Sequence, residues 1–226
     1  MKLKNVSVSY EKKIVLDHFS LDVPAGKITC VLGPSGCGKT TLLHCIAGVI
    51  DYSGTIEEAP LKTAFIFQTP NLIPSMTVEK NVEYVLKSQI KDKKLRKKLV
   101  LDILKEVGLN GEEKSYPKKL SGGMAQRVSL ARAFCYPSDV LLMDEPFIGL
   151  DVSLKKQILR LFLHLTEEQN RTVVFVTHDI DEALLAGDKI VVMKGSDRVE
   201  FYCDVPRAER TLSALNDLKE QIYALL

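Results

Sequence analysis

Two hydrophobic patterns along the chain predict its main elements. Apolar and polar residues alternate over 6–10 and 14–23 around a polar turn at 11–13, which predicts two antiparallel β-strands. Uninterrupted apolar runs, each bounded by loops or by helical composition, then occupy 28–32, 64–67, 140–143, 173–176 and 190–193. Such runs are typical of a mostly parallel sheet covered on both faces. The pattern predicts an α/β core with an antiparallel β-subdomain at its start.

A helical pattern separates the second and third of these apolar runs. Between about 77 and 133 no strand pattern appears, and apolar residues recur at helical spacing, for example at Leu95, Leu99, Ile103 and Val107. Gly108 is placed to end this helix. Helical spacing returns over 154–165 and 215–225. We expect one domain over 1–226, with an inserted helical subdomain at about 77–133 and a short tail at about 194–226.

Composition narrows the classes of function. The 226 residues carry a formal charge of +2, with 46% hydrophobic and 27% charged residues, as in an ordinary globular protein. A balance this close to neutral gives no support for nucleic-acid binding, which needs a basic face. The one basic run, 91–98, is interpreted as a solvated helix face, although a patch for anionic lipid or an acidic partner is the alternative.

Cysteine usage and the apolar runs predict where the protein works. Its five cysteines are odd in number and form no CxxC pair, so we expect a reducing compartment without disulfides or a zinc site. No stretch is long and apolar enough to be a membrane span, and the start has no signal-peptide pattern. We therefore expect a cytoplasmic protein that can dock on a membrane partner.

The strongest local signal is the segment 33–40, Gly-Pro-Ser-Gly-Cys-Gly-Lys-Thr, which fits GxxxxGK[ST] between a buried strand and a helix. This is the pattern of a P-loop. Its backbone N–H groups point at phosphates, Lys39 adds positive charge, and the Thr40 hydroxyl can ligate Mg²⁺. The predicted nucleotide contacts are Gly33, Pro34, Ser35, Gly36, Cys37, Gly38, Lys39, Thr40 and Thr41.

A second acidic element narrows the class of nucleotide-binding protein. The apolar run 140–143 ends in Asp144 and Glu145, at the carboxyl edge of the predicted sheet, where ligands of open α/β sheets bind. Asp144 suits Mg²⁺ coordination. Glu145 follows it in what should be extended chain, so it points elsewhere and is the candidate general base for the attacking water.

The segment 120–124, Leu-Ser-Gly-Gly-Met, is the most specific motif. It has the composition of a helix start, with Ser121 as cap and the amides of Gly122 and Gly123 available to an anion. With this motif the chain resembles the ATP-binding subunits of ABC transporters, over about 6–193. The resemblance implies that these three residues receive the γ-phosphate of an ATP held by a second subunit, so one chain alone does not complete the site.

The remaining motifs of that family appear in order. The resemblance implies that Tyr10 stacks on adenine and that Gln68 reaches Mg²⁺ and links to the membrane subunit. It also implies that Asp151 lies at the dimer interface and that His178 contacts the γ-phosphate. The pair Ile148-Gly149 stands where small residues are more usual in this family, and this departure could alter dimer contacts. Lys39, Gln68, Glu145 and His178 are the expected catalytic residues.

The resemblance implies an ATPase that uses ATP and Mg²⁺ and pairs with a second ATPase subunit, for which we expect a second copy of this chain. It also implies that this ATPase drives separate permease subunits on the cytoplasmic face of the membrane. The resemblance is greatest to the importers of nitrate, sulfonates, taurine or thiamine precursors. These importers also use an extracytoplasmic solute-binding protein. The alternatives are a multi-subunit exporter and, less favoured, an ABC ATPase of DNA repair or translation. The segment between Lys39 and Leu120 lacks the heptads of the repair ATPases, and the chain has one P-loop where the ribosomal ones have two.

Overall fold

A computed structural model describes residues 1–11, 13–60, 62–194, 197–202, 210–211 and 213–226. Cys203 and part of the expected tail lie outside the described residues. The chain folds into two compact units. The first comprises Met1–Thr63, Asp139–Glu145 and Asn170–Leu226, and the second Ala64–Ser138 and Pro146–Gln169. The single domain with its inserted subdomain stays a prediction.

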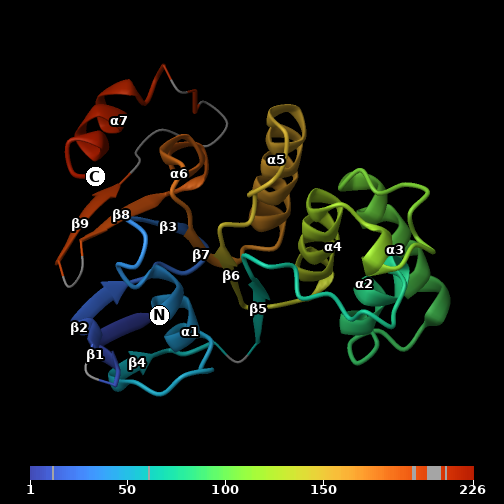
Figure 1. The fold of residues 1–226 in the computed structure, drawn as a ribbon, viewed down its shortest axis with the longest axis horizontal. Helices are drawn as coiled ribbons and strands as arrows, with labels where there is room; N and C mark the ends of the chain where they lie inside the picture. The colour runs from blue at the N-terminus through green and yellow to red at the C-terminus, as the bar shows by residue number, and fades with distance from the viewer. Residues whose placement is uncertain (12, 61, 195–196, 203–209, 212) are drawn as a thin grey trace. The chain divides into compact units, whose positions relative to one another are not determined.

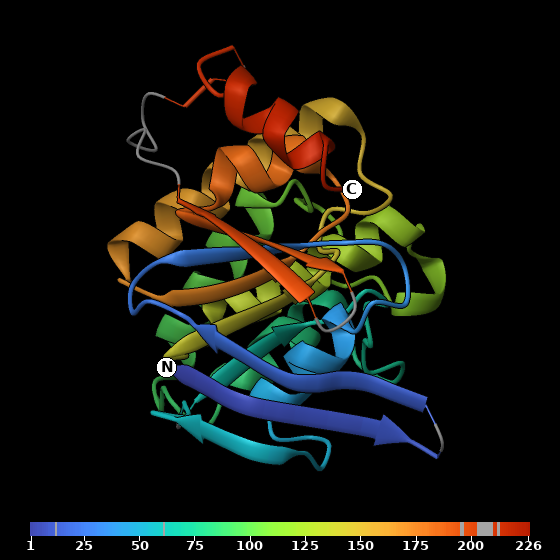
Figure 2. The same cartoon turned by 90° about the vertical axis from the view of Figure 1, so that its left-hand side faces the viewer.

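The first unit contains the predicted antiparallel sheet. β1 (Lys2–Tyr10) and β2 (Lys13–Asp22) pair antiparallel, as the alternating pattern predicts. A strand that the pattern did not predict, β4 (Ser53–Glu57), pairs with the other edge of β1, so the order is β2-β1-β4 (Figures 1 and 2). Its sequence, SGTIE, contains one large apolar residue, which explains why the hydrophobic pattern missed it.

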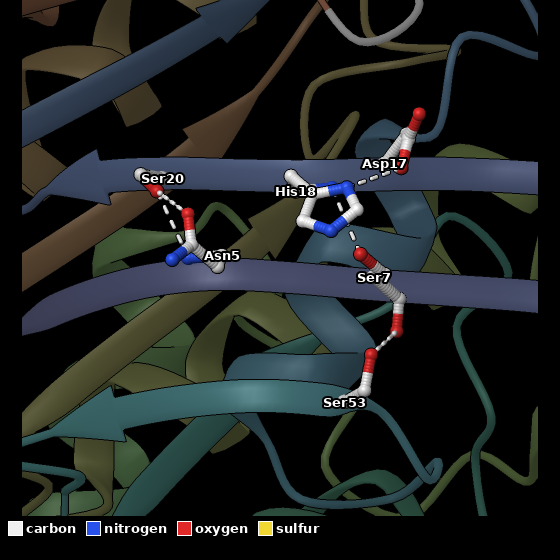
Figure 3. Close-up of polar contacts among 6 residues, drawn as sticks. All are labelled: Asn5, Ser7, Asp17, His18, Ser20 and Ser53. Atoms are coloured by element: carbon white, nitrogen blue, oxygen red, sulfur yellow. Dashed lines mark hydrogen bonds and ion pairs between the residues drawn. The ribbon is translucent and has the colours of Figure 1, made fainter.

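Irregularities in this sheet are held by serine hydroxyls (Figure 3). Asn5 and His18 have φ of 49° and 46°, and the register between β1 and β2 shifts near them. The displaced backbone N–H of Asn5 donates to Ser20 Oγ at 2.9 Å, and that of His18 donates to Ser7 Oγ at 2.8 Å. Side-chain acceptors thus replace the ladder partners that the bulges remove.

The core sheet of the first unit is built from the predicted apolar runs. Its strands run in the order β6 (Val140–Asp144), β7 (Thr172–Val176), β3 (Ile28–Leu32), β8 (Lys189–Lys194) and β9 (Asp197–Tyr202). The first four are parallel and almost entirely buried, as predicted, whereas β9 is an antiparallel edge strand that was not predicted. Parallel pairing brings the carboxyl ends of β3, β6 and β7 to one edge of the sheet.

Three helices lie within the described residues of the first unit. α1 (Lys39–Ile46) packs on β6 and β7, α6 (Ile180–Ala186) packs on β3, and the two lie on opposite sides of the sheet (Figures 1 and 2). α7 (Asn216–Tyr223) packs on α6, where Lys219 Nζ lies 2.6 Å from Asp181 Oδ1. α1 follows β3 and α6 follows β7 along the chain, so both helices begin near the carboxyl edge of the core sheet.

The second unit is mainly helical. β5 (Thr63–Ile66) is followed by α2 (Val78–Leu86), α3 (Lys93–Glu106), a 3-10 turn (Pro117–Lys119) and α4 (Gly122–Cys135). The chain then contributes 139–145 to the first unit, and α5 (Val152–Glu168) follows in the second. α2, α3 and α4 pack on one another. The helices expected between 77 and 133 are therefore present.

α3 differs in detail from its predicted face. Ile103 and Val107 are buried, as predicted, but Leu95 and Leu99 are exposed, and Val100 and Leu104 are buried in their place. The lysines of the basic run are exposed, as a solvated face predicts. Arg96 is the exception, because its Nε lies 3.1 Å from Glu83 Oε1 and its Nη1 donates to the carbonyl of Ile90 at 2.7 Å.

No helix within the described ranges is long and apolar enough to span a bilayer. Of the cysteines that the structure describes, none forms a disulfide.

Candidate functional site

The loop 33–38 joins β3 to α1 and is shaped by three glycines. Gly33, Gly36 and Gly38 have φ of 156°, 81° and 103°, and Gly38 is the N-cap of α1. A Cβ on Gly38 would lie 3.0 Å from Leu16 and 3.1 Å from the carbonyl oxygen of Val15, so a side chain there would be both strained and crowded. The sequence pattern thus forms a compact loop at a helix N-terminus, where backbone N–H groups favour anions.

Lys39 is folded back over this loop. Its side chain is buried, and Nζ donates to the carbonyl oxygens of Gly33 at 2.8 Å and Pro34 at 2.9 Å. The ammonium group therefore already lies inside the curve of the loop. Its two acceptors are neutral carbonyl oxygens, which make weaker hydrogen bonds with an ammonium group than anionic oxygens do.

Thr40 and Asp144 are brought together across the sheet edge. Thr40 Oγ1 donates to Asp144 Oδ2 at 2.8 Å, and the Asp144 carboxylate is buried at the end of β6. Burial raises the pKa of Asp144, and the hydrogen bond from Thr40 partly opposes this shift. A buried carboxylate beside a hydroxyl offers oxygen donors, which are the ligands that a hard cation prefers.

Glu145 and His178 form the second contact at this edge. His178 follows β7, and its Nδ1 lies 3.3 Å from Glu145 Oε2. Glu145 has φ of 47°, so the expectation of extended chain after Asp144 was wrong: the backbone turns into the left-handed region, and its N–H donates to Val176 O at 2.9 Å. The two adjacent carboxylates have different partners, Thr40 for Asp144 and His178 for Glu145.

The signature residues lie at the start of α4 in the second unit. Ser121 is the N-cap, as predicted, and its hydroxyl accepts from the N–H of Met124 at 3.3 Å. Gly122 has open space around its Cβ position. A Cβ on Gly123 would lie 3.1 Å from the carbonyl oxygen of Gly149, so the glycine permits close approach of the loop before α5.

Asp151 is close to this loop in the same unit. It is the N-cap of α5 and accepts from the N–H of Leu154 at 3.0 Å. Ile148 is exposed, and Gly149 has φ of 75°. The second unit thus brings together the signature start and the loop that carries Asp151, a proximity that the sequence did not predict.

Two predicted residues have surroundings that say less about their chemistry. Tyr10 is the last residue of β1 and is half exposed, as a stacking aromatic must be before it meets a ligand. Gln68 is exposed two residues after β5 in the second unit. The P-loop, Asp144, Glu145 and His178 therefore form one cluster in the first unit, whereas Gln68, the signature and Asp151 belong to the second.

The sequence did not predict two residues whose side chains make hydrogen bonds to the backbone of the segment after Gln68. Asn81 is completely buried: its Oδ1 accepts from Ile73 N at 2.8 Å and its Nδ2 donates to three carbonyl oxygens. Arg132 donates to the carbonyl oxygens of Asn71 at 3.1 Å and Pro70 at 3.3 Å. The signal for Asn81 was available, because a lone amide stands on the apolar face of α2 between Val78 and Val82.

A P-loop with a buried strand-end carboxylate and a second carboxylate paired with histidine, on a parallel sheet, defines a P-loop ATPase. Comparison with protein families gives the same class, since residues 16–148 match the model of the ABC transporter family. The chain belongs to this family, and its activity is ATP hydrolysis coupled to transport.

Curated relatives include import ATPases. The chain is 42% identical over 180 residues to an aliphatic sulfonates import ATP-binding protein of Pseudomonas syringae pv. tomato, covering 79% of this chain and 75% of that one. It is 41% identical over 191 residues to the aliphatic sulfonates import ATP-binding protein of Bacillus subtilis, covering 81% and 74%.

Solved structures agree in fold. A dimeric ATP-binding cassette in a post-hydrolysis state, bound to ADP and Pi, superposes with a TM-score of 0.80 at 32% identity, covering 89% of this chain and 97% of that one. A second dimeric bacterial ABC transporter cassette gives a TM-score of 0.81 at 32% identity, with the same coverage.

Proposed function

We propose that this chain is the ATPase subunit of an importer for small organic anions of the sulfonate class. One observation supports the proposed ATPase site, namely the cluster at the carboxyl edge of the core sheet. It consists of Lys39 on the P-loop, the Thr40–Asp144 pair and the Glu145–His178 pair. Two relatives about 40% identical, both named as aliphatic sulfonates import ATP-binding proteins, support the substrate class.

The first unit binds ATP through its P-loop. The backbone N–H groups of 33–41, apart from Pro34, which has none, hold the phosphates. Lys39 replaces its two carbonyl acceptors with phosphate oxygens, and Tyr10 stacks on the adenine. Cys37 is buried in this loop, so bulky modification of its thiol would obstruct the phosphates.

A magnesium ion fits the donor set that Thr40 and Asp144 present. No group of three or more His, Cys, Asp or Glu side chains among the described residues could hold a metal by itself. Mg²⁺ is commonly held by one or two protein oxygens together with substrate phosphates, so two protein oxygens at this position suffice. When bound, it would supply positive charge to the phosphate oxygens, with Gln68 as a further proposed ligand.

Glu145 orients and deprotonates the attacking water, and His178 is placed to donate to the γ-phosphate. Their 3.3 Å separation lets the carboxylate also hold the imidazole ring in place. Lys39 and His178 then stabilise the charge of the transferring phosphoryl group.

The second unit contacts the ATP of a second subunit. Ser121, Gly122 and Gly123 stand at the N-terminal end of α4, where N–H groups and the helix dipole favour an anion. Asp151 lies in the loop beside them and belongs to the same interface. The two ATPase subunits, proposed here as identical copies, close on ATP and separate after hydrolysis.

The force passes to permease subunits in the membrane, with the chain held peripherally on their cytoplasmic side. The proposed docking segment is 68–74, which Asn81 and Arg132 fasten to the helices of the second unit. Because these hydrogen bonds hold the segment 68–74 to the helices, a movement of the second unit would displace the bound permease subunit as well. An extracytoplasmic solute-binding protein delivers the substrate to the complex.

Replacing Glu145 by Gln tests the catalytic assignment. The variant keeps nucleotide contacts but loses the general base, so we expect ATP turnover to fall by at least about 100-fold, because such bases contribute about 10²–10⁴-fold. ATP should then hold the variant as a dimer, measured by light scattering with ATP and with ADP. Turnover equal to that of the unmodified protein would contradict the role of Glu145.

The substrate class has a separate test. Deleting the gene in its host should abolish growth on an alkanesulfonate as sole sulfur source while leaving growth on sulfate unchanged. Recovery of the tagged chain with ribosomal or DNA-bound proteins, in place of membrane subunits, would contradict the transport assignment itself.

A further inference from the structure

A buried carboxylate lies directly behind the loop that carries His178. Glu182, in the first turn of α6, and Thr177, the residue before His178, are 6% and 2% exposed. Thr177 Oγ1 donates to Glu182 Oε2 at 2.7 Å in this buried setting. Neither residue belongs to the nucleotide contacts proposed above.

The Thr177 hydroxyl also acts as an acceptor. It receives the backbone N–H of Asp179 at 3.1 Å, while Asp179 caps α6 by accepting from the N–H groups of Asp181 and Glu182. In an ordinary capping box the acidic residue at the third helical position accepts directly from the N-cap N–H. Here a hydroxyl is inserted between them, so its single proton is directed at Glu182 and its lone pair at Asp179.

We call the hydrogen-bonded chain from Asp179 N through the Thr177 hydroxyl to the Glu182 carboxylate the relay. The relay fixes the backbone on both sides of His178. On one side, Thr177 N donates to Val31 O at 3.2 Å, which ties the loop to β3 just before the P-loop. On the other side, Asp179 is held to α6 through the Thr177 hydroxyl. The imidazole between them is 66% exposed, so its direction toward Glu145 depends on its backbone more than on packing of the ring.

We propose that Thr177 and Glu182 are positioning residues that hold His178 in line with Glu145 and the γ-phosphate. This proposal rests on the role proposed above for His178. Because misplacement of a reacting group by about 1 Å can cost 100-fold in rate, loss of the relay lowers turnover without weakening ATP binding by the P-loop.

The test compares Thr177→Val with Thr177→Ser in the whole 226-residue chain. Valine keeps the shape but removes the hydroxyl, whereas serine keeps it. We expect T177V to lower kcat at least about tenfold with KM for ATP within about twofold, and T177S to restore kcat. Glu182→Ala should match T177V, because it removes the carboxylate acceptor of the same bond.

Two further variants separate this role from a purely structural one. Lys219→Met breaks the contact with Asp181 on the outer side of α6 and should leave kcat unchanged. Adding T177V to His178→Ala should lower kcat no further than H178A alone, because the relay acts through the histidine. All assays are run well below the measured melting temperatures.

The outcomes are distinguishable. Wild-type kcat in T177V and E182A, with kcat lost in H178A, would overturn the positioning role and leave the proposed function intact. A further drop on adding T177V to H178A would overturn it as well. Wild-type turnover in H178A would contradict the role proposed for the histidine, and the positioning proposal with it.

Discussion

Lys39, for which we propose a contact with phosphate, is already held inside its loop. Its ammonium group is buried against two carbonyl oxygens of the loop, so the proposed exchange of these acceptors for phosphate oxygens needs little rearrangement. Such preorganisation lowers the entropic cost of binding.

Replacing Lys39 by Ala should weaken ATP binding about 10- to 100-fold, because charge-assisted hydrogen bonds contribute about 1.5–3 kcal/mol. Equilibrium titration with a fluorescent ATP analogue measures this effect. Gln89→Ala, an exposed change in the helical unit, is the control and should bind ATP normally. Unchanged affinity in K39A would contradict the assignment of the loop.

Cys45 gives a prediction on pH. Burial raises the pKa of this thiol from 9.0 to about 11, so the folded protein keeps the proton where the unfolded chain loses it. The stability that this proton confers is complete below pH 9 and is lost as pH rises toward 11, by at most about 3 kcal/mol.

Denaturant unfolding between pH 8 and 11 checks this prediction. We expect the stability of the native chain to fall more steeply than that of Cys45→Ala, which has no thiol to ionise. Parallel curves for the two proteins would show that the thiol titrates alike in the folded and unfolded chains.

At the residue scale, the sequence predicted which residues lie near one another better than it predicted their backbone conformation. The spacing of the P-loop and the end of an apolar run identified Lys39, Thr40 and Asp144, because these positions follow from strand and loop geometry alone. The left-handed turn at Glu145 was missed, since that conformation is set by a hydrogen bond to Val176 on the neighbouring strand. Thr177 and Glu182 were missed for the same reason, because their relation is tertiary.

The end of α3 shows an element determined by local sequence. Gly108 has φ of 68°, its N–H donates to Lys105 O, and Leu109 N donates to Leu104 O, which together form a Schellman motif. The Arg127 guanidinium donates to Gly108 O at 2.6 Å, joining this end to α4. Gly108 could therefore be placed from sequence as the end of the helix.

Gly108→Ala should cost about 2–3 kcal/mol of unfolding free energy. About 1–2 kcal/mol comes from the left-handed backbone, and the rest arises because the new Cβ would lie 3.1 Å from Arg127 Nη1. Gly111→Ala is a matched control, because Gly111 has φ of 92° but open space around it. Urea unfolding should show a larger loss of unfolding free energy for G108A than for G111A. Equal losses would show that crowding against Arg127 does not contribute.

Elements that depend on pairing were harder to predict. β4 carries a single large apolar residue, and the bulges at Asn5 and His18 depend on serines of neighbouring strands. The buried face of α3 was partly wrong because apolar spacing alone cannot tell Leu99, which is exposed, from Val100, which is buried. Strands and helices with strong local patterns were confirmed, whereas those fixed by partners were not found.

At the scale of the whole molecule, the candidate site is divided between the two units. The P-loop cluster lies in the first, and the signature with Asp151 lies in the second. A division of this kind suits an enzyme whose site is completed by a second subunit, as proposed above. It also means that turnover should depend on protein concentration, or on the membrane subunits that bring two copies together.

ATP-driven uptake into vesicles tests the central proposal most directly. The chain is reconstituted with its membrane subunits and solute-binding protein in proteoliposomes that contain Mg-ATP at the face of the ATPase. We predict that an alkanesulfonate moves away from the binding protein and accumulates on the ATP side, and that Glu145→Gln abolishes this movement. Transport in the opposite direction, or equal transport with E145Q, would contradict an import ATPase powered by this site.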